Sequence, residues 1–480
     1  MRVAGRRQRT YSASVNPRLA LAVTAGRTAG FVTRKLGRGG GTALPGLVAE
    51  RIHPQLVHDL ARQLGGGRVM ITGTNGKTTT SRIVAQVLTE ARRPFVHNRE
   101  GSNLMRGLAS TLLAIASPTG RIPGAVRMAG LFEVDEATTP AAAQAIAPNA
   151  IAFTNLFRDQ LDRYGEVDTV AGFWREALKR TPKTATLVLN ADDPSVAELA
   201  LEWPGPVHWF GLDDPAFATD VVGAVDARWC RRCGGSFAYD RRYFAHIGHW
   251  RCAGCGRSRP APDTSASNVR LGLDEASFTV AGLGEVRMPL TGAYNVYNAL
   301  AAIGLARVLG MPDDAIRAGL ANVRAAFGRQ EVAELEGRKL RLLLTKNPAG
   351  ANQVLRLLAA VAGEQGAGGL KVAVLLNDRF ADGQDVSWIW DVDFELTQNV
   401  TAACWAGGDR AEDIALRLKY AGWPKPTAIE RDPAKLLDAV LEGTTPGDQV
   451  FVIPTYTAML DLRAELQRRG AVSQFWERET

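Results

Sequence analysis

The sequence predicts an α/β protein in which a mostly parallel β-sheet is covered by helices on both faces. Short apolar runs alternate with longer helical stretches along most of the chain, a glycine-bearing turn joins one apolar run directly to a helix at residues 69–85, and the alternation restarts after residue 326. Strands that alternate with helices in this way are typical of doubly wound parallel sheets. We therefore expect one α/β domain before residue 326 and a second one after it.

The size and composition are those of an ordinary globular protein with a basic start. The 480 residues suffice for two or three domains, and 46% hydrophobic with 22% charged residues is a usual balance. No apolar run reaches the roughly 18 residues that a membrane-spanning helix needs. Residues 1–40 hold nine Lys or Arg and no acidic residue, so this segment either contacts anionic lipid or an anionic substrate, or is a solvated tail. A signal peptide is not expected, because Arg18 and Arg27 interrupt its apolar run.

The predicted elements follow one another in the order that this fold class requires. Residues 1–15 are expected to be disordered, and residues 212–285 break the strand–helix rhythm. Helices are expected at residues 19–35, 45–64, 103–116, 138–147, 168–180 and 295–309. Strands are expected at residues 92–98, 130–134, 150–154, 186–189, 340–344, 370–376, 402–405 and 449–453.

The stretch around residues 69–85 has the features of a phosphate-binding loop. A strand at residues 69–71 leads through a turn into a helix that begins near Thr78, and such a turn directs backbone N–H groups and the positive helix end toward an anion. A lysine suits the β- and γ-phosphates and a following threonine suits Mg²⁺. Ile71 stands where the first glycine of the GxxxxGK[ST] pattern would be, so a glycine turn that binds no nucleotide is the alternative. We interpret the loop as an ATP or GTP site; its candidate binding residues are Gly73, Thr74, Asn75, Gly76, Lys77, Thr78 and Thr79.

Two polar stretches follow later strands. Residues 133–136, with the sequence EVDE, place three carboxylates at the end of a strand, where they are candidate Mg²⁺ ligands or simply an acidic loop start. Residues 154–165 are also polar and follow a strand, and the carboxyl ends of parallel strands are where open α/β sheets bind ligands. A helix cap by Asp159 is the alternative for this second stretch.

Four of the five cysteines form two CxxC pairs. Cys230 and Cys233 are separated by 18 residues from Cys252 and Cys255, a spacing that indicates a Cys₄ zinc ribbon in a reducing cytoplasm. Four thiolates leave no open coordination position, so the zinc is expected to be structural, although the surrounding arginines leave a nucleic-acid role as the alternative. Two histidines within or beside the ribbon, His246 and His249, are expected at the surface, and the fifth cysteine, Cys404, is expected to be buried.

Taken in order, these motifs resemble the Mur ligase superfamily over roughly residues 45–480. The matching stretches are GTNGKTT (73–79), EVDE (133–136), TNLFRDQLDRYG (154–165), LNADDP (189–194), TGAYNVYNALAA (291–302) and FGRQE (327–331). The resemblance implies a central ATP-binding domain that phosphorylates a carboxylate, and an amine that attacks the acyl phosphate. It implies that Lys77 and Thr78 hold the triphosphate and that Glu133 binds Mg²⁺. It further implies that Asn298 contacts the adenine, that Arg329 reaches the nucleotide from the far side, and that Asn155 lines the same cleft.

The chain departs from the amino-acid-adding members of this superfamily. Those members have histidines where Gln160 and Tyr294 stand, and a carbamylated lysine in the helix after DxxDRYG, for which Trp174, Arg175 and Lys179 are poor counterparts. Their C-terminal domain opens with an aspartate-containing motif, whereas residues 344–350 read LTKNPAG.

The zinc ribbon, KNPAGANQ and LLNDRFADGQDVSWIWD (375–391) together resemble the synthetase subunits of the lipid II isoglutaminyl synthases. This resemblance implies amidation of the α-carboxylate of D-glutamate in the lipid II stem peptide with ATP and Mg²⁺, in the cytoplasm or at the inner face of the membrane. The ammonia would come from a separate GatD-type glutaminase subunit, whose site Asp385, or else Asp382, would complete. From the residues alone, Asp385 is equally a helix cap beside the candidate interface anchors Trp388 and Trp390.

The complete prediction is a Mur ligase-type central P-loop ATPase domain with an inserted Cys₄ zinc ribbon and a C-terminal Rossmann-like α/β domain. The predicted segments are a basic N-terminal segment (1–45), the central domain (46–325), the ribbon insertion (about 225–260) and the C-terminal domain (326–480). An amino-acid-adding Mur or folylpolyglutamate-type ligase and a zinc-ribbon ATPase that binds nucleic acid are the alternatives. We expect no nucleic-acid partner, because the chain shows no platform of alternating aromatic and basic residues.

Overall fold

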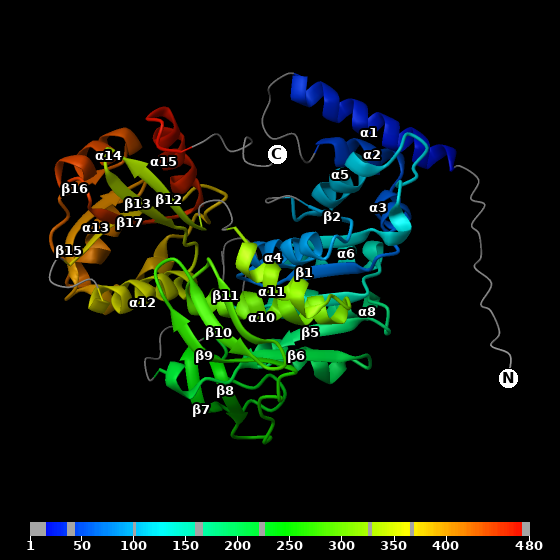
Figure 1. The fold of residues 1–480 in the computed structure, drawn as a ribbon, viewed down its shortest axis with the longest axis horizontal. Helices are drawn as coiled ribbons and strands as arrows, with labels where there is room; N and C mark the ends of the chain where they lie inside the picture. The colour runs from blue at the N-terminus through cyan, green and yellow to red at the C-terminus, as the bar shows by residue number, and fades with distance from the viewer. Residues whose placement is uncertain are drawn as a thin grey trace.

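The computed structural model describes residues 16–35, 44–98, 102–158, 167–219, 226–324, 329–364 and 369–472. The predictions for residues 1–15 and for Asp159 and Gln160 fall outside these residues. Figure 1 shows two α/β bodies side by side, with the C-terminal one in yellow to red.

A nine-stranded sheet forms the larger body, in the order β11-β10-β9-β6-β5-β4-β1-β3-β2. The strands from β2 to β6 are parallel to their neighbours, β9 runs parallel to β6, and β9, β10 and β11 are antiparallel. Their bounds are β1 Arg68–Thr72, β2 Phe95–His97, β3 Ala129–Glu133, β4 Ala150–Phe153, β5 Thr186–Asn190, β6 Val207–Leu212, β9 Thr264–Leu271, β10 Ala276–Val280 and β11 Gly284–Met288. The strands predicted before residue 190 are confirmed, whereas β6 was not predicted.

Helices cover both faces of this sheet because successive strand residues point to opposite sides. Val69 and Ile71 of β1 belong to the core under one set of helices, and Met70 belongs to the core under the other. The first set is α4 Lys77–Glu90, α10 Ala293–Val308 and α11 Asp313–Asn322. The second set is α3 Leu56–Ala61, α5 Met105–Ile115, α6 Thr139–Ile146 and α8 Val167–Arg180, and a short helix, α9 Pro194–Ala197, follows β5. Two further helices, α1 Pro17–Lys35 and α2 Leu44–Ile52, pack on α5.

The single helix predicted at residues 45–64 is wrong. The chain forms α2 and α3 instead, with Pro54 between them. Proline has no N–H to donate and its ring clashes with the preceding helical turn, so it interrupts a helix interior.

The smaller body is a six-stranded sheet in the order β12-β13-β17-β14-β15-β16. Its strands are β12 Arg329–Leu335, β13 Arg338–Leu343, β14 Leu370–Leu375, β15 Thr401–Gly407, β16 Ala428–Glu430 and β17 Gln449–Pro454, and only the β12–β13 pair is antiparallel. One face is covered by α12 Pro348–Glu364 and α13 Ala411–Tyr420, the other by α14 Pro433–Glu442 and α15 Tyr456–Arg468. The four strands predicted here are confirmed; β12 and β16 were not predicted.

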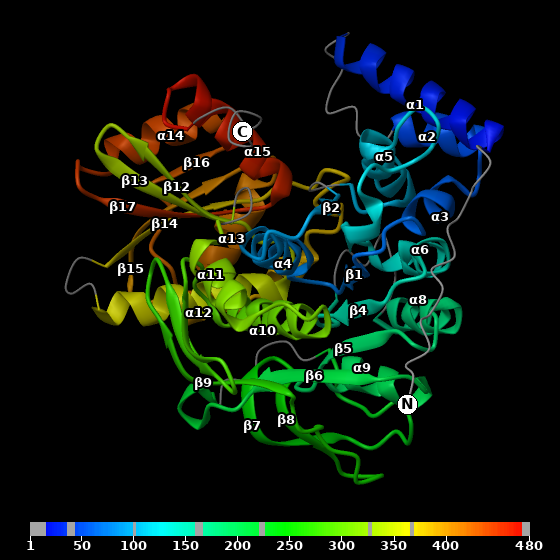
Figure 2. The same cartoon turned by 45° about the vertical axis from the view of Figure 1, so that its right-hand side comes forward.

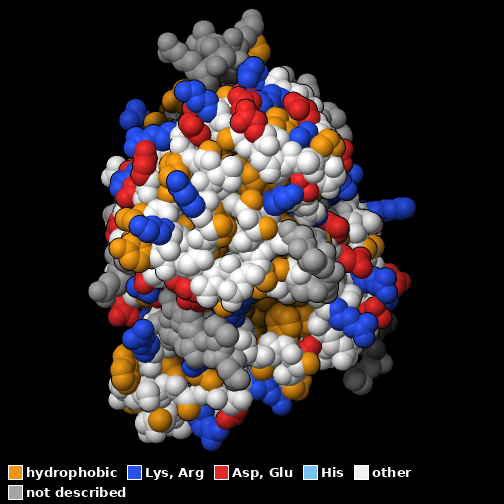
Figure 3. Space-filling view, turned by 90° about the vertical axis from the view of Figure 1, so that its left-hand side faces the viewer, with side chains coloured by type: hydrophobic (Ala, Val, Ile, Leu, Met, Phe, Trp, Pro, Cys, Tyr) orange, Lys and Arg blue, Asp and Glu red, His pale blue; other side chains and the backbone are white. Residues whose placement is uncertain are grey.

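The cysteine-containing insertion adds a two-stranded antiparallel hairpin, β7 Phe237–Phe244 and β8 Ile247–Cys252. In Figures 1 and 2 this hairpin and α1 lie at opposite ends of the larger body. Basic and acidic side chains are mixed on the face of the molecule in Figure 3. Within the described residues, no helix combines the length and the hydropathy that crossing a bilayer requires.

Candidate functional site

The turn after β1 depends on two glycines that approach other segments closely. Gly73 and Gly76 have φ values of +141° and +87°, a backbone region that glycine adopts without steric cost. A Cβ on Gly73 would lie 2.0 Å from Thr154 Oγ1, and one on Gly76 would lie 1.9 Å from Asn298 Oδ1. The turn therefore leads directly into α4 and exposes the backbone N–H groups at the start of this helix, as a phosphate site requires.

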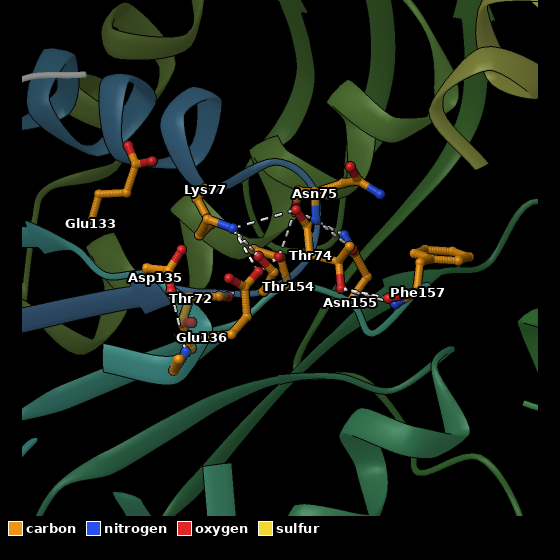
Figure 4. Close-up of polar contacts among 12 residues, drawn as sticks. Thr72, Thr74, Asn75, Lys77, Glu133, Asp135, Glu136, Thr154, Asn155 and Phe157 are labelled. Carbon is orange, nitrogen blue, oxygen red and sulfur yellow. Dashed lines mark hydrogen bonds and ion pairs between the residues drawn. The ribbon is translucent and has the colours of Figure 1, made fainter. Parts of the chain in front are cut away.

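The end of β4 holds this loop in place (Figure 4). The Asn75 N–H donates to Asn155 Oδ1 at 2.9 Å, and Asn155 Nδ2 donates back to the Asn75 carbonyl at 3.0 Å. The hydroxyl of Thr154 donates to the same carbonyl at 2.7 Å, and the Thr74 N–H donates to the Asn155 carbonyl at 3.0 Å. Since β1 and β4 are neighbouring parallel strands, their carboxyl ends meet and the loop is fixed before any ligand binds.

Lys77 is buried and paired with a carboxylate. Its Nζ donates to Glu136 Oε1 at 2.7 Å and to the Gly73 carbonyl at 2.6 Å, and the residue is 9% exposed. Burial alone would lower the pKa of Lys77, but the adjacent Glu136 carboxylate raises it above its usual value. Burial raises the pKa of Glu136, and Lys77 opposes this shift. The site thus holds a lysine cation beside the phosphate loop.

Glu133 lies at the end of β3, next to the start of α4. Thr78 Oγ1 donates to Glu133 Oε1 at 3.0 Å. Adjacent oxygens in an octahedron with Mg–O bonds of about 2.1 Å are separated by about 3.0 Å, so this hydroxyl and this carboxylate fit two neighbouring ligand positions of Mg²⁺. The third carboxylate of the EVDE cluster, Asp135, accepts a hydrogen bond from the Ala137 N–H at 3.3 Å.

Asn98 positions Glu133 and was missed by the sequence analysis. Its Nδ2 donates to the carbonyls of Glu133 at 2.9 Å and Ser102 at 3.0 Å, and its Oδ1 accepts from the Glu133 N–H at 2.8 Å. Because β2 ends at His97, the Asn98 amide takes the place of the next peptide group of β2 and extends the pairing with β3. The signal that could have found it is a polar residue at the carboxyl end of the strand predicted at residues 92–98.

A cavity beside the phosphate loop lies between the two bodies. Its central-domain wall includes Thr79, Asn155 and the residues of α10 around Asn298, and the opposite wall includes residues 343–347, 349 and 350. Asn298 is buried, and its Nδ2 donates to Asn295 Oδ1 at 3.1 Å. The side chain of Asn347 reaches across and donates from Nδ2 to Asn75 Oδ1 at 3.0 Å. The stretch LTKNPAG therefore contacts the phosphate loop directly, a role that its sequence did not reveal.

Other residues singled out in the sequence are placed as follows. Arg329 begins β12, but its side chain lies outside the described part of the structure. The indole of Trp174 is fully buried in α8. Arg175 pairs with Glu198 at 3.2 Å, and the exposed Lys179 pairs with its helix neighbour Glu176 at 3.4 Å.

The four CxxC cysteines converge at one end of the β7–β8 hairpin. All four are free thiols whose Sγ atoms lie within 4.8 Å of one another, with Cys230–Cys255 at 4.0 Å and Cys233–Cys252 at 3.4 Å. A tetrahedron with Zn–S bonds of about 2.3 Å has S···S edges of about 3.8 Å, so the four thiols fit a tetrahedral metal ion. Among the described residues this is the one such cluster of Cys, His, Asp or Glu ligands.

The prediction that His246 lies at the surface is wrong. His246 is fully buried at the turn between β7 and β8, where its ring lies 4.5 Å from the ring of Phe157. His249 is largely buried, and its Nε2 lies 2.9 Å from the Leu212 carbonyl. The ribbon packs against the sheet instead of projecting from it, so its inner residues are covered. Cys404 is buried, as predicted.

Asp382 and Asp385 line a second cavity, which shares Lys346 and Asn347 with the first. Asp382 is 3% exposed, and its carboxylate accepts from the N–H and the hydroxyl of Thr457 at the start of α15. Asp385 is exposed, and its Oδ1 accepts from the Ser387 N–H at 2.8 Å. Asp382 is thus bonded within the fold, to the start of α15, whereas Asp385 is accessible to solvent.

Comparison with known proteins places this arrangement in a class. The family model of the Mur ligase middle domain matches residues 71–228, and that of the MurT ligase C-terminal domain matches residues 344–459. The solved pseudomurein peptide ligase type C from Methanothermus fervidus superposes with a TM-score of 0.63 at 20% identity, covering 85% of this chain and 80% of that one. The phosphate loop, the sheet order and these matches define a ligase of the Mur type.

Two curated relatives narrow the class. The Streptococcus pneumoniae protein named lipid II isoglutaminyl synthase (glutamine-hydrolyzing) subunit MurT is 35% identical over 464 residues, which is 95% of this chain and 99% of that protein. The Staphylococcus aureus (strain COL) protein of the same name is 34% identical over 89% of this chain and 93% of that protein. The chain belongs to the MurT family.

Proposed function

We propose that this protein uses ATP and Mg²⁺ to amidate the α-carboxylate of D-glutamate in the stem peptide of lipid II, with ammonia supplied by a glutaminase partner. The observation that carries the proposal is the cavity in which Asn75, Gly76 and Thr79 of the phosphate loop face the Asn347 segment of the C-terminal domain, with the Thr78–Glu133 pair at the start of the same helix. The names of the MurT relatives supply the substrate and the product.

In this proposal the nucleotide occupies the cavity at the phosphate loop. The backbone of residues 73–79 and the Lys77 cation bind the triphosphate, Asn298 and Asn155 contact the nucleotide from α10 and β4, and Arg329 contacts it from the C-terminal domain. Thr78 and Glu133 hold Mg²⁺, which supplies charge neutralisation at the phosphates when it is bound. Lys77, which is paired with Glu136 at 2.7 Å, exchanges this partner for the phosphate oxygens when the nucleotide binds.

The proposed amidation proceeds in two steps. A carboxylate oxygen of D-glutamate attacks the γ-phosphorus, the bond to ADP breaks, and an acyl phosphate forms. The nitrogen lone pair of ammonia then attacks the acyl carbon, phosphate leaves with the bonding electrons, and the amide nitrogen loses a proton. Lys77 and the N-terminus of α4 stabilise the charge that develops on the transferred phosphoryl group.

Ammonia is a smaller nucleophile than an amino acid, which agrees with the altered C-terminal stretch. Lys346, Asn347 and Pro348 stand where amino-acid-adding relatives carry an aspartate motif; Lys346 and Asn347 line both cavities, and Pro348 lines the second one. We propose that a GatD-type glutaminase docks near the second cavity and that the exposed Asp385 completes its active site. The Asp385→Asn variant should then lose glutamine-dependent amidation and keep ammonium-dependent amidation, whereas the matched surface variant Asp314→Asn should keep both.

We also propose a structural zinc ion held by the four cysteines, and contact of α1 with the membrane that carries lipid II. Leu21, Phe31 and Val32 on α1 are 61%, 55% and 46% exposed, in the basic N-terminal segment. Apolar side chains among basic ones suit the surface of an anionic bilayer. Co-sedimentation with anionic vesicles but not with neutral ones is the expected result.

The experiment that tests the function is product mass spectrometry with purified protein, lipid II, ATP and ammonium. The expected product is lighter than lipid II by the mass difference between a hydroxyl and an amino group. Lys77→Ala should abolish it, and Lys179→Ala, which removes an exposed lysine, should not. A product that appears only with an added amino acid would refute the proposal in favour of an amino-acid-adding ligase.

A further inference from the structure

The ribbon hairpin connects the cysteine cluster to the edge of the nucleotide cavity. Phe237 pairs with Cys252 at one end, and Phe244 pairs with Ile247 at the other. At about 3.4 Å per residue, the tip lies about 24 Å from the cysteine end. We define the tip as residues 243–247.

The tip is docked in the interior of the protein. Every residue of the tip is less than 9% exposed, and Tyr243 Oη donates to the Leu212 carbonyl at 2.9 Å. Along β8, the Gly248 N–H donates to the Asp192 carbonyl at 3.0 Å, and Trp250 Nε1 donates to the Ala191 carbonyl at 2.9 Å. These bonds attach the hairpin to the carboxyl ends of β5 and β6, the edge of the sheet where ligands bind (Figure 2).

Phe244 at the tip is a wall of the nucleotide cavity. It lines this cavity together with Phe157 and Tyr297. Its ring is stacked on Phe157 with centroids 6.2 Å apart and planes at 18°, and it meets Tyr297 edge-on at 5.6 Å. An aromatic wall of this kind suits the flat face of a nucleotide base.

His246 supports Phe157 from behind. The imidazole is fully buried, neither ring nitrogen has a hydrogen-bond partner, and the nearest carboxylate oxygen, Asp193 Oδ2, is 3.5 Å away. That carboxylate oxygen already accepts from the Leu156 N–H at 2.8 Å. The imidazole ring packs against Phe157 with centroids 4.5 Å apart and fills the space behind it.

Phe157 in turn is bonded to the phosphate loop. The Phe157 N–H donates to Thr74 Oγ1 at 3.0 Å, and the Thr74 hydroxyl donates to the Phe157 carbonyl at 3.1 Å (Figure 4). The tip also touches the other domain, because Arg356 Nη1 of α12 donates to the Tyr243 carbonyl at 3.1 Å. One hairpin tip thus lines the cavity, contacts the C-terminal domain, and reaches the phosphate loop through Phe157.

We propose that the tip of the ribbon hairpin is part of the nucleotide site. Phe244 forms the wall of the base pocket, and His246 is a positioning residue that holds Phe157, and through it Thr74 of the phosphate loop. The inserted ribbon thereby sets the affinity for ATP. This inference rests on the proposed nucleotide binding and not on the acceptor substrate.

The test is calorimetric titration of the full chain with ADP and Mg²⁺, accompanied by thermal unfolding of each variant. Phe244→Leu keeps apolar volume and removes the aromatic face, so it should weaken ADP binding about fivefold or more. His246→Ala leaves Phe157 unsupported and should weaken binding about tenfold, whereas His246→Phe restores a ring of similar size and should bind within about twofold of the wild type. In turnover assays the KM for ATP should rise while kcat at saturating ATP changes little.

The matched control is Trp229→Ala, which removes an aromatic side chain that is 65% exposed at the cysteine end of the ribbon. It should leave ADP affinity unchanged. Equal affinity in Phe244→Leu, His246→Ala and the wild type would overturn the inference, and so would a His246→Phe variant that binds as weakly as His246→Ala at the same melting temperature. Since the readout is nucleotide affinity, failure of the wild type to amidate lipid II would refute the proposed function alone.

Discussion

Replacing Asn98 tests whether the position of Glu133 depends on a side chain that contacts no ligand itself. Asn98 makes three buried hydrogen bonds, two of them to the main chain of Glu133. The Asn98→Ala variant removes all three at about 1 to 1.5 kcal/mol each, which predicts a loss of about 3 to 4.5 kcal/mol in the free energy of unfolding. Loss of a residue that orients a metal ligand typically lowers metal affinity about 10- to 100-fold. Asn98→Ala should therefore raise the Mg²⁺ concentration needed for nucleotide binding by a similar factor.

Two measurements separate folding from function in this case. Urea unfolding gives the loss of stability, and ADP binding titrated against Mg²⁺ gives the metal dependence at a temperature where the variant is folded. The control is Asn322→Ala, which removes a surface hydrogen bond to Glu90 at 2.8 Å and should change stability by less than about 1 kcal/mol. If folded Asn98→Ala needs no more Mg²⁺ than the wild type, the Asn98 amide does not position a metal ligand and the reasoning is wrong.

Three further predictions concern pH, the phosphate loop and the cysteine cluster. Burial and a nearby arginine lower the pKa of His97 from 6.5 to about 4 in the folded protein. As the pH falls below 6.5, the His97 imidazole therefore takes up a proton in the unfolded chain before it does so in the folded one. The free energy of unfolding should therefore drop by about 3 kcal/mol toward pH 4 relative to a His97→Phe variant, and parallel pH profiles would contradict this. Gly76→Ala adds a Cβ at positive φ against a side-chain amide and should weaken ADP binding about tenfold or more in titrations, whereas Gly124→Ala, also at positive φ but with no neighbour within 4 Å, should not. Cys233→Ser should eliminate bound zinc in metal analysis and lower the melting temperature, whereas Cys404→Ser should retain the zinc; zinc retained by Cys233→Ser would contradict a Cys₄ site.

The sequence predicted the features that depend on neighbouring residues. The strand–turn–helix at residues 69–85 is confirmed because hydrophobic periodicity and glycine positions are local properties of the chain. The CxxC pairs converge as expected, since the spacing within each pair already brings two thiols together. The family was also identified correctly from the order of short motifs.

The sequence failed to predict some elements and residue positions where the packing of distant parts of the chain determines the structure. The strand β6 was not predicted, although it carries the inserted hairpin and extends the sheet to β9. His246 was expected at the surface because the four cysteines already complete the zinc site and leave this histidine no ligand role, yet the docked hairpin buries it completely.

The candidate site also combines features that are encoded locally with contacts that depend on long-range packing. The sequence alone determined that a glycine-bearing phosphate loop, an acidic cluster and two CxxC pairs exist, because each is encoded within a few residues. Only the tertiary structure decided that Glu136 pairs with Lys77, that Asn98 holds Glu133, and that Asn347 contacts Asn75 across 272 residues of chain. These partners meet through the order of parallel strands and the packing of two domains, and the free energy that fixes both comes from burial summed over the whole core, which no short segment encodes.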